Sequence, residues 1–138
     1  FAFERLLKVF GKIQDHNVLL MGVSYRGDVG DTRYSPVETL FELIKNQTEK
    51  IKLHDPFVDF WQEKKLIVEC KLEDVITSEL DMIIISTGHS LYKKESTIDI
   101  LMSIPPTNIY DTIGIFSESQ LTLLQQKHKV SVLGRGDL

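Results

Sequence analysis

Apolar runs of four or five residues alternate with amphipathic stretches along the whole chain. The runs predict six strands, the third of them the weakest, at 17–21, 51–54, 66–69, 82–86, 108–111 and 130–133. The remaining stretches predict helices at 1–15, 36–46, 72–78, 94–103 and 117–127, and a helical turn at 59–65. Short apolar strands that alternate with helices are typical of a parallel sheet covered on both faces. The pattern therefore predicts an α/β fold: a doubly wound, Rossmann-like domain in three layers with about six parallel strands.

Two of the predicted helices begin with specific capping signals. Ser35 is a favourable N-cap, and Pro36 suits the first helical position because its fixed φ matches the helix. Ser117 is followed three residues later by Gln120, which is the spacing of a capping box. The helix start at Ser35 also bounds a long loop, 22–34, that follows the first predicted strand.

Composition limits the classes of function. A chain of 138 residues with 42% hydrophobic and 26% charged residues is typical of one globular domain. The net charge of −4 argues against broad nucleic-acid binding, and no apolar run is long enough to span a bilayer. A single cysteine, Cys70, excludes an internal disulfide and fits a reducing compartment, so we expect a cytoplasmic protein.

The loop after the first strand is the first candidate site, because ligands of such sheets bind beyond the carboxyl ends of the strands. Residues 22–36 contain three glycines and two arginines and lead into a helix N-terminus, a combination that favours anions. The alternative is a surface loop whose arginines and aspartates pair with one another. Gly22, Ser24 and Gly27 nearly match the dinucleotide fingerprint, but Ser24 replaces the middle glycine and the helix begins too late. The loop is therefore not a standard NAD cradle.

The same loop carries a family resemblance. Gly-Val-Ser-Tyr-Arg at 22–26, followed by Asp-Thr-Arg-Tyr-Ser-Pro at 31–36, resembles the signature loop that opens the C-terminal domain of the UDP-glucose and GDP-mannose dehydrogenases. Other segments match that domain in order and spacing, at His54–Val58, Ser86–Tyr92, Tyr110–Thr112 and Gly134–Gly136. The resemblance implies a nucleotide-sugar-binding C-terminal domain at 17–138. Residues 1–16 are then a helical stub or linker from the preceding part of the enzyme, or a helix that covers the sheet.

The resemblance implies an NAD-dependent nucleotide-sugar 6-dehydrogenase, which oxidises a UDP-sugar or GDP-sugar to its uronic acid for polysaccharide or surface glycan synthesis. It implies that Tyr25 and Arg26 bind the substrate and that Arg33 reaches the cofactor. The catalytic cysteine and the main NAD fold belong to the N-terminal part of such enzymes, so we expect no catalytic residue here and no activity of this chain alone. The implied partners are the nucleotide sugar, the N-terminal and central parts of the enzyme, and further copies in a homo-oligomer. Ile113 stands where the family usually has an arginine, which leaves the particular sugar nucleotide open.

Other reactive side chains have both a functional and a structural interpretation. Cys70 has no base nearby in sequence, so inert packing is favoured over a nucleophile. His89 follows a strand and is either a base or ligand or, the favoured interpretation, a hydrogen-bonded loop residue. Asp55 is expected to form a turn before Pro56, whereas the role of Asp111 is open. The remaining histidines lack the spacing of a metal site, and we expect no bound metal; they are His16, His54 and His128.

Two rival functions remain from other classes. A signalling receiver domain has a similar length and architecture, but it needs an acidic pair after the first strand and a phosphoacceptor aspartate after the third. Here Tyr25 and Arg26 follow the first predicted strand and Lys71 follows the third, which argues against a receiver. A non-catalytic interaction domain is the other alternative.

Overall fold

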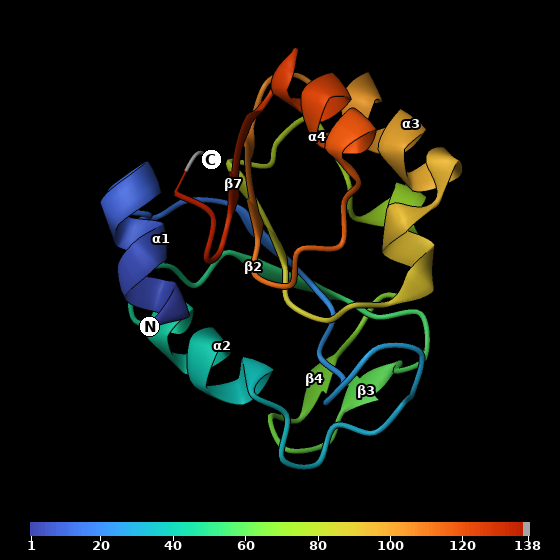
Figure 1. Cartoon of the computed structure of the whole chain (residues 1–138). Coiled ribbons are helices and arrows are strands. Elements are labelled where there is room, and N and C mark those ends of the chain that lie inside the picture. The colour runs from blue at the N-terminus through green and yellow to red at the C-terminus, as the bar shows by residue number, and fades with distance from the viewer. Residues whose placement is uncertain (137–138) are drawn as a thin grey trace.

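The computed structural model describes residues 1–136, so the last two residues of the predicted domain 17–138 lie outside the described part. Five strands form a parallel sheet in the order β2-β1-β5-β6-β7. Its two edge strands, β2 and β7, are labelled in Figure 1. Their bounds are β1 Val18–Met21, β2 Ile51–His54, β5 Met82–Ile85, β6 Asn108–Asp111 and β7 Lys129–Val132. The order reverses at β1, which has β2 on one side and β5 on the other. The predicted doubly wound α/β fold is confirmed, and its topological switch point lies at the carboxyl ends of β1 and β5.

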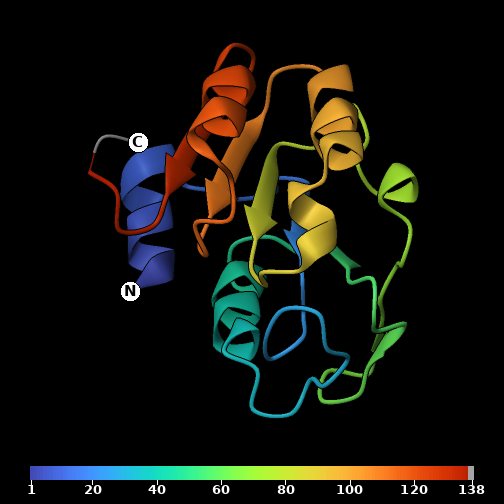
Figure 2. The ribbon, with the colours of Figure 1, turned by 45° about the vertical axis from the view of Figure 1, so that its right-hand side comes forward.

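Helices cover both faces of the sheet (Figure 2). The α-helices are α1 Ala2–Phe10, α2 Val37–Lys45, α3 Glu95–Ser103 and α4 Glu118–Gln125, and two short 3₁₀ helices are η1 Leu72–Asp74 and η2 Ser90–Lys93. Side chains alternate along each strand, so Leu19 and Met21 pack in the core under α3 and α4, whereas Val18 and Leu20 pack under α1 and α2. The central strands β1 and β5 are buried throughout, which explains their purely apolar sequences.

The first helix covers the sheet, as one of the two sequence interpretations allowed. It ends at Phe10 rather than near residue 15, because Gly11 adopts φ +80°. Leu6 is completely buried, and Phe10 meets the Tyr110 ring edge-on at 5.9 Å. The Tyr110 hydroxyl donates to the carbonyl oxygen of Ala2 at 2.8 Å. Both ends of α1 are therefore attached to β6.

Two sequence predictions for the segment after β2 are wrong. Residues 59–65 do not form a helical turn, and residues 66–69 are not a strand of the parallel sheet, to which Glu69 contributes only an isolated parallel bridge with His54. Instead β3 Phe60–Trp61 and β4 Leu66–Ile67 form a separate antiparallel pair, with Lys65 at φ +55° before β4. Trp61 is buried against Phe41 at a ring distance of 5.2 Å, which fixes this hairpin beside α2. The parallel sheet thus has five strands rather than six.

The capping box predicted at Ser117 is confirmed, whereas α2 begins one residue later than predicted, at Val37 with Pro36 as its N-cap. The Ser117 hydroxyl accepts the Gln120 N–H at 3.2 Å, and the Gln120 side chain accepts the Ser117 N–H at 3.0 Å, which completes the capping box. The Ser35 hydroxyl accepts the Val37 N–H at 3.2 Å. The predicted helix at 72–78 is reduced to η1. None of the helices in the described part of the chain is long and apolar enough to cross a membrane.

Candidate functional site

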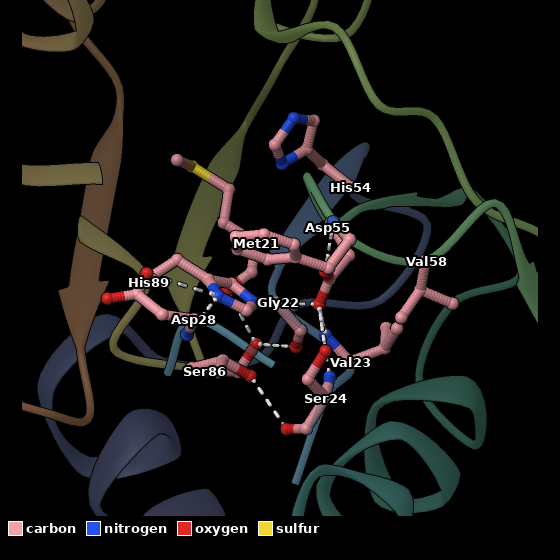
Figure 3. A network of polar contacts seen from close by, with 12 residues as sticks. Met21, Gly22, Val23, Ser24, Asp28, His54, Asp55, Val58, Ser86 and His89 are labelled. Carbon is pink, nitrogen blue, oxygen red and sulfur yellow. Dashed lines mark hydrogen bonds and ion pairs between the residues drawn. The ribbon is translucent and has the colours of Figure 1, made fainter. Parts of the chain in front are cut away.

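Three loops meet at the switch point, after β1, β2 and β5. The loop after β1 is the predicted binding loop, residues 22–36, and the loop after β5 contains residues 86–90. Asp55 lies between them, directly after β2, and Figure 3 shows it at the centre of a network of polar contacts. This edge of the sheet is where the topology predicts a ligand.

Asp55 organises the start of the binding loop. Its side chain is completely buried, and Oδ2 accepts the N–H groups of Val23 at 3.0 Å and Ser24 at 3.1 Å, together with the Ser24 hydroxyl at 2.8 Å (Figure 3). Oδ1 accepts the Phe57 N–H at 2.9 Å, the turn bond that was predicted from sequence. Burial by itself would raise the pKa of Asp55, but hydrogen bonds from His89, Phe57 and Val23 outweigh it and hold the pKa below its usual range. Asp55 is therefore an ionised, fully bonded carboxylate with a structural role.

His89 is the hydrogen-bonded loop histidine that the sequence favoured. Its side chain is completely buried, and Nδ1 accepts the Asp28 N–H at 2.9 Å. Since Nδ1 is an acceptor, the ring proton lies on Nε2, which donates to Oδ2 of Asp55 at 2.8 Å. The Asp28 carboxylate in turn accepts the N–H of Ser90 at 2.8 Å and its hydroxyl at 2.5 Å, and these bonds lower the pKa of Asp28.

The glycines of the binding loop allow close packing between loops. A Cβ at Gly27 would overlap with the carbonyl oxygen of Gly88, and a Cβ at Gly22 would overlap with the side chain of Thr87. A Cβ at Gly30 would lie 2.7 Å from the carbonyl oxygen of Phe57. The absence of a Cβ at these glycines therefore lets neighbouring loops approach one another closely. The helix after this loop begins only at Val37, well beyond Gly27, and in this it differs from the dinucleotide fingerprint.

Tyr25 and Arg26, the predicted substrate residues, lie side by side on the surface of this loop. The Tyr25 side chain is 47% exposed, and the Arg26 guanidinium lies 5.8 Å from the centre of its ring. The Tyr25 N–H donates to the carbonyl oxygen of Asp31 at 2.7 Å and so closes the loop behind them. An aromatic ring and a forked cation are thus presented together at the switch point.

Arg33, the predicted cofactor residue, pairs with Asp31 in the same loop. Nε donates to Oδ1 at 3.1 Å, and Nη2 donates to Oδ2 at 2.9 Å. Hydrogen bonds from Arg33 lower the pKa of Asp31 to about 2. The structure therefore contains the Arg–Asp pair that the sequence raised as the alternative for this loop. Next to it, Tyr34 is 96% exposed and adopts φ +57°, so an aromatic ring stands free beside Arg33.

Of two other candidates, Asp111 takes a structural role, whereas the packing in the core expected for Cys70 is wrong. Cys70 is exposed, and its thiol lies 3.6 Å from the carbonyl oxygen of Val58. Partial burial and nearby carboxylates raise the pKa of its thiol, which makes it a poor nucleophile. Asp111 accepts the N–H groups of Ile113, Gly114 and Ile115 at 2.8–2.9 Å and thereby shapes the loop after β6.

Sequence reasoning missed the interactions of a second buried histidine. Nε2 of His54 donates to the carbonyl oxygen of Cys70 at 3.1 Å, which leaves Nδ1 to accept the Tyr92 hydroxyl at 2.9 Å. Burial lowers the pKa of His54 and raises that of Tyr92 well above its usual value. The only sequence signal was the position of His54 at a strand end. Within residues 1–136, no group of three or more histidine, cysteine or carboxylate side chains is arranged to hold a metal ion.

The fold is a doubly wound α/β domain, and the predicted binding loop lies at its switch point. A sequence model described as the UDP-glucose/GDP-mannose dehydrogenase family, UDP binding domain, matches residues 19–118. The chain therefore belongs to the UDP-glucose/GDP-mannose dehydrogenase family, and the resemblance predicted from the sequence is confirmed.

Curated relatives and solved structures agree with this family. UDP-N-acetyl-D-mannosamine dehydrogenase of Pyrococcus horikoshii is 28% identical over 99% of this chain and 29% of its own length, and its solved structure matches with a TM-score of 0.74. The enzyme of the same name from Methanocaldococcus jannaschii is 28% identical over 99% of this chain and 31% of its length. A solved NDP-N-acetyl-D-galactosaminuronic acid dehydrogenase from Methanosarcina mazei, 20% identical over 97% of this chain and 28% of that one, shares the fold with a TM-score of 0.75. The chain spans less than a third of the length of these relatives.

Proposed function

We infer that this chain is the nucleotide-sugar-binding domain of an NAD-dependent dehydrogenase, which oxidises the C6 hydroxyl of a UDP-N-acetylhexosamine to a carboxylate. The family match to a UDP binding domain supports the nucleotide, and the names of the relatives support an N-acetylated sugar. The uronic acid product suits polysaccharide or surface glycan synthesis in the cytoplasm. In this proposal residues 17–138 form the binding domain, and the helix within 1–16 leads toward the N-terminal and central parts of a homo-oligomeric enzyme.

One observation carries the proposal: Tyr25 and Arg26 project together from a loop that is bonded to the core at the switch point. An exposed ring offers a stacking surface for a base or a sugar. A guanidinium offers forked donors to phosphate oxygens. Both groups are needed for a nucleotide sugar, which combines a planar base, a diphosphate and a sugar.

NAD would supply the acceptor for the two successive hydride transfers of this oxidation. The loop after β1 departs from the fingerprint that cradles its pyrophosphate, because Ser24 replaces the middle glycine and α2 begins only at Val37. In our proposal other parts of the enzyme hold NAD, and Arg33 contributes a cation at the edge that faces it. The nucleophile also lies elsewhere, since the raised pKa of the Cys70 thiol opposes thiolate chemistry.

Calorimetric titration of this chain tests the proposal. We expect UDP and UDP-N-acetylglucosamine to bind, and GDP-mannose to bind more weakly. The Arg26→Ala variant should bind the uridine ligands more weakly than wild type, while absorbance at the NADH band should stay flat with NAD and any of these sugars. Absence of uridine-nucleotide binding, or equal binding by Arg26→Ala, would contradict the assignment of this loop. Turnover by the chain alone would contradict its assignment as a binding domain.

The strand order favours one rival, because receiver domains share this five-stranded topology. In a receiver, acidic residues follow the first strand and the phosphoacceptor ends the third strand of the sheet. Here β1 is followed by Gly22 to Arg26, and the third parallel strand, β5, ends at Ile85 and is followed by Ser86. We therefore expect no magnesium-dependent labelling by acetyl phosphate, and stable labelling would favour the receiver.

A further inference from the structure

A buried histidine with no role in the proposed binding chemistry joins two of the loops at the switch point. His89 is completely buried, with Asp28 N–H on one ring nitrogen and the Asp55 carboxylate on the other. Neutral imidazole offers one acceptor and one donor, so it satisfies both neighbours at once. The side chain thus connects the loop after β1 to the end of β2, although it belongs to the loop after β5 (Figure 3).

The contact between the loops is reciprocal. Asp28 gives its N–H to His89, and its carboxylate accepts two hydrogen bonds from Ser90. Asp28 also adopts φ +61°, a conformation that costs free energy for a residue with a Cβ and persists where surrounding contacts hold it. Gly27 and Gly88 meet backbone to backbone beside it. We call these five residues, Gly27, Asp28, Gly88, His89 and Ser90, the loop clasp.

The loop clasp and Asp55 bind the backbone on both sides of Tyr25 and Arg26. Before the pair, the N–H and hydroxyl of Ser24 donate to Asp55. After the pair, the Asp28 N–H donates to His89. The His89–Asp55 hydrogen bond joins these two anchors, while the side chains of Tyr25 and Arg26 stay exposed. Tyr25 and Arg26 therefore belong to a backbone segment that is hydrogen-bonded on both sides to the buried His89–Asp55 pair.

We propose that His89 is a positioning residue for nucleotide-sugar binding: its bridge between Asp55 and the Asp28 amide fixes the backbone that presents Tyr25 and Arg26. The inference rests on the function proposed above. A loop held in its bound conformation loses less conformational freedom when ligand binds, so the bridge strengthens binding without touching the ligand. Releasing either end should loosen the loop and weaken binding, while the groups that contact ligand remain present.

Three substitutions separate the two ends of the bridge. His89→Asn keeps an acceptor near the position of Nδ1, and His89→Gln keeps a donor near the position of Nε2, whereas His89→Leu removes both. His128→Gln is the matched control, because His128 is also buried and also bridges two segments, accepting the Thr107 N–H and donating to the Leu101 carbonyl. His128 lies just before β7, at the opposite edge of the sheet.

Amide hydrogen exchange by NMR and calorimetric titration with UDP test the proposal on this chain. In each His89 variant we expect faster exchange at Ser24 or Asp28, with unchanged exchange at Leu20 in β1. The affinity for UDP should fall about three- to tenfold, the effect of one lost hydrogen bond, and most in His89→Leu. His128→Gln should change neither the loop exchange nor the UDP affinity, even where it lowers the melting temperature.

Two results would overturn the positioning role. One is unchanged exchange at Ser24 and Asp28 in all folded His89 variants, and the other is faster exchange with UDP affinity equal to wild type. If His89→Leu does not fold, His89→Asn and His89→Gln decide the matter. Failure of the wild-type chain to bind UDP would contradict the proposed function itself. Binding by wild type that the His89 variants match would contradict only the inference about His89.

Discussion

Arg33 and Asp31 face each other through two parallel hydrogen bonds, from Nε to Oδ1 at 3.1 Å and from Nη2 to Oδ2 at 2.9 Å. The Arg33 N–H adds a third bond to Oδ1 at 2.9 Å. Such a bidentate contact fixes the plane of the guanidinium as well as its position. The pair is exposed, so it orients a surface cation at the entrance to α2 and contributes little to the stability of the fold.

The acid titration of Asp31 should report this pair. Hydrogen bonds from Arg33 lower its pKa to about 2, so we expect carbon-13 NMR of the carboxyl group to give a midpoint near that value. Because the pKa is lowered in the folded state, the contribution to stability is present above the ordinary value of 3.8 and is lost as pH falls toward 2. Arg33→Ala should return the midpoint toward 3.8, whereas Arg5→Ala, in α1, should leave it unchanged.

Arg33→Ala also tests the proposed cofactor contact. In the longer enzyme we expect the Michaelis constant for NAD to rise, with a smaller effect on that for the nucleotide sugar. The melting temperature should stay nearly unchanged, because an exposed ion pair contributes little to folding. A lowered melting temperature together with an unchanged Michaelis constant for NAD would show that Arg33 only shapes the loop.

Arg26→Ala should weaken UDP binding by about 1.5–3 kcal/mol, the range for a hydrogen bond to a charged group. Arg26→Lys should retain part of this free energy, because the charge remains but the forked geometry is lost. Calorimetric titration measures both, and Lys12→Ala, an exposed cation after α1, serves as the control. If Arg26→Ala and Lys12→Ala bind UDP equally well, Arg26 does not contact the nucleotide.

Gly27→Ala should lower the free energy of unfolding by about 1–3 kcal/mol, the usual cost of overpacking. A Cβ at this position meets the Gly88 carbonyl, a backbone group that cannot rotate away. Gly136→Ala is the matched control, since no atom lies within 4 Å of the added Cβ. Urea denaturation of both variants gives the comparison, and equal stability would mean that the two loops separate without cost.

Stability should fall as pH drops below about 6.5, because burial lowers the pKa of both His54 and His128. The unfolded chain takes up protons at these histidines before the folded chain does, so acid favours unfolding. Each histidine contributes at most about 1.4 kcal/mol per pH unit. Urea denaturation at pH 7.5 and 5.5 measures the slope, and His128→Gln should reduce it. An identical slope in that variant would mean that the pKa of His128 is the same in the folded and the unfolded chain.

Local signals allowed much of the fold to be predicted from sequence. The central strands of the parallel sheet are apolar because both faces of the sheet are covered. The capping box at Ser117 could be predicted because it depends only on residues at the N-terminus of one helix. The hairpin at β3 and β4 was missed because its strands contain two residues each, and its positive φ falls on Lys65, which carries no turn signal. What fixes the hairpin is the packing of Trp61 on Phe41, a contact between distant segments.

The candidate site could be predicted only in part, because it too depends on contacts between distant segments. The local pattern indicated the loop 22–36, the family resemblance singled out Tyr25 and Arg26 within it, and Asp55 and His89 were each located after a strand. Their hydrogen bond depends on β2 and β5 lying on either side of β1, which is a property of strand order. A single sequence contains no local signal for the order of the strands.

The backbone contact between Gly27 and Gly88 bears on how such domains can be recombined. No side chain separates the two loops there, so their surfaces fit as one piece, although sixty residues of sequence lie between them. In a chimera that receives residues 22–36 from a relative, the grafted loop would face this chain's own loop at 86–90, with which it did not evolve. To exchange substrate specificity between two such domains, both loops should therefore be grafted together, because a graft of one loop alone would lose the close backbone contact between them.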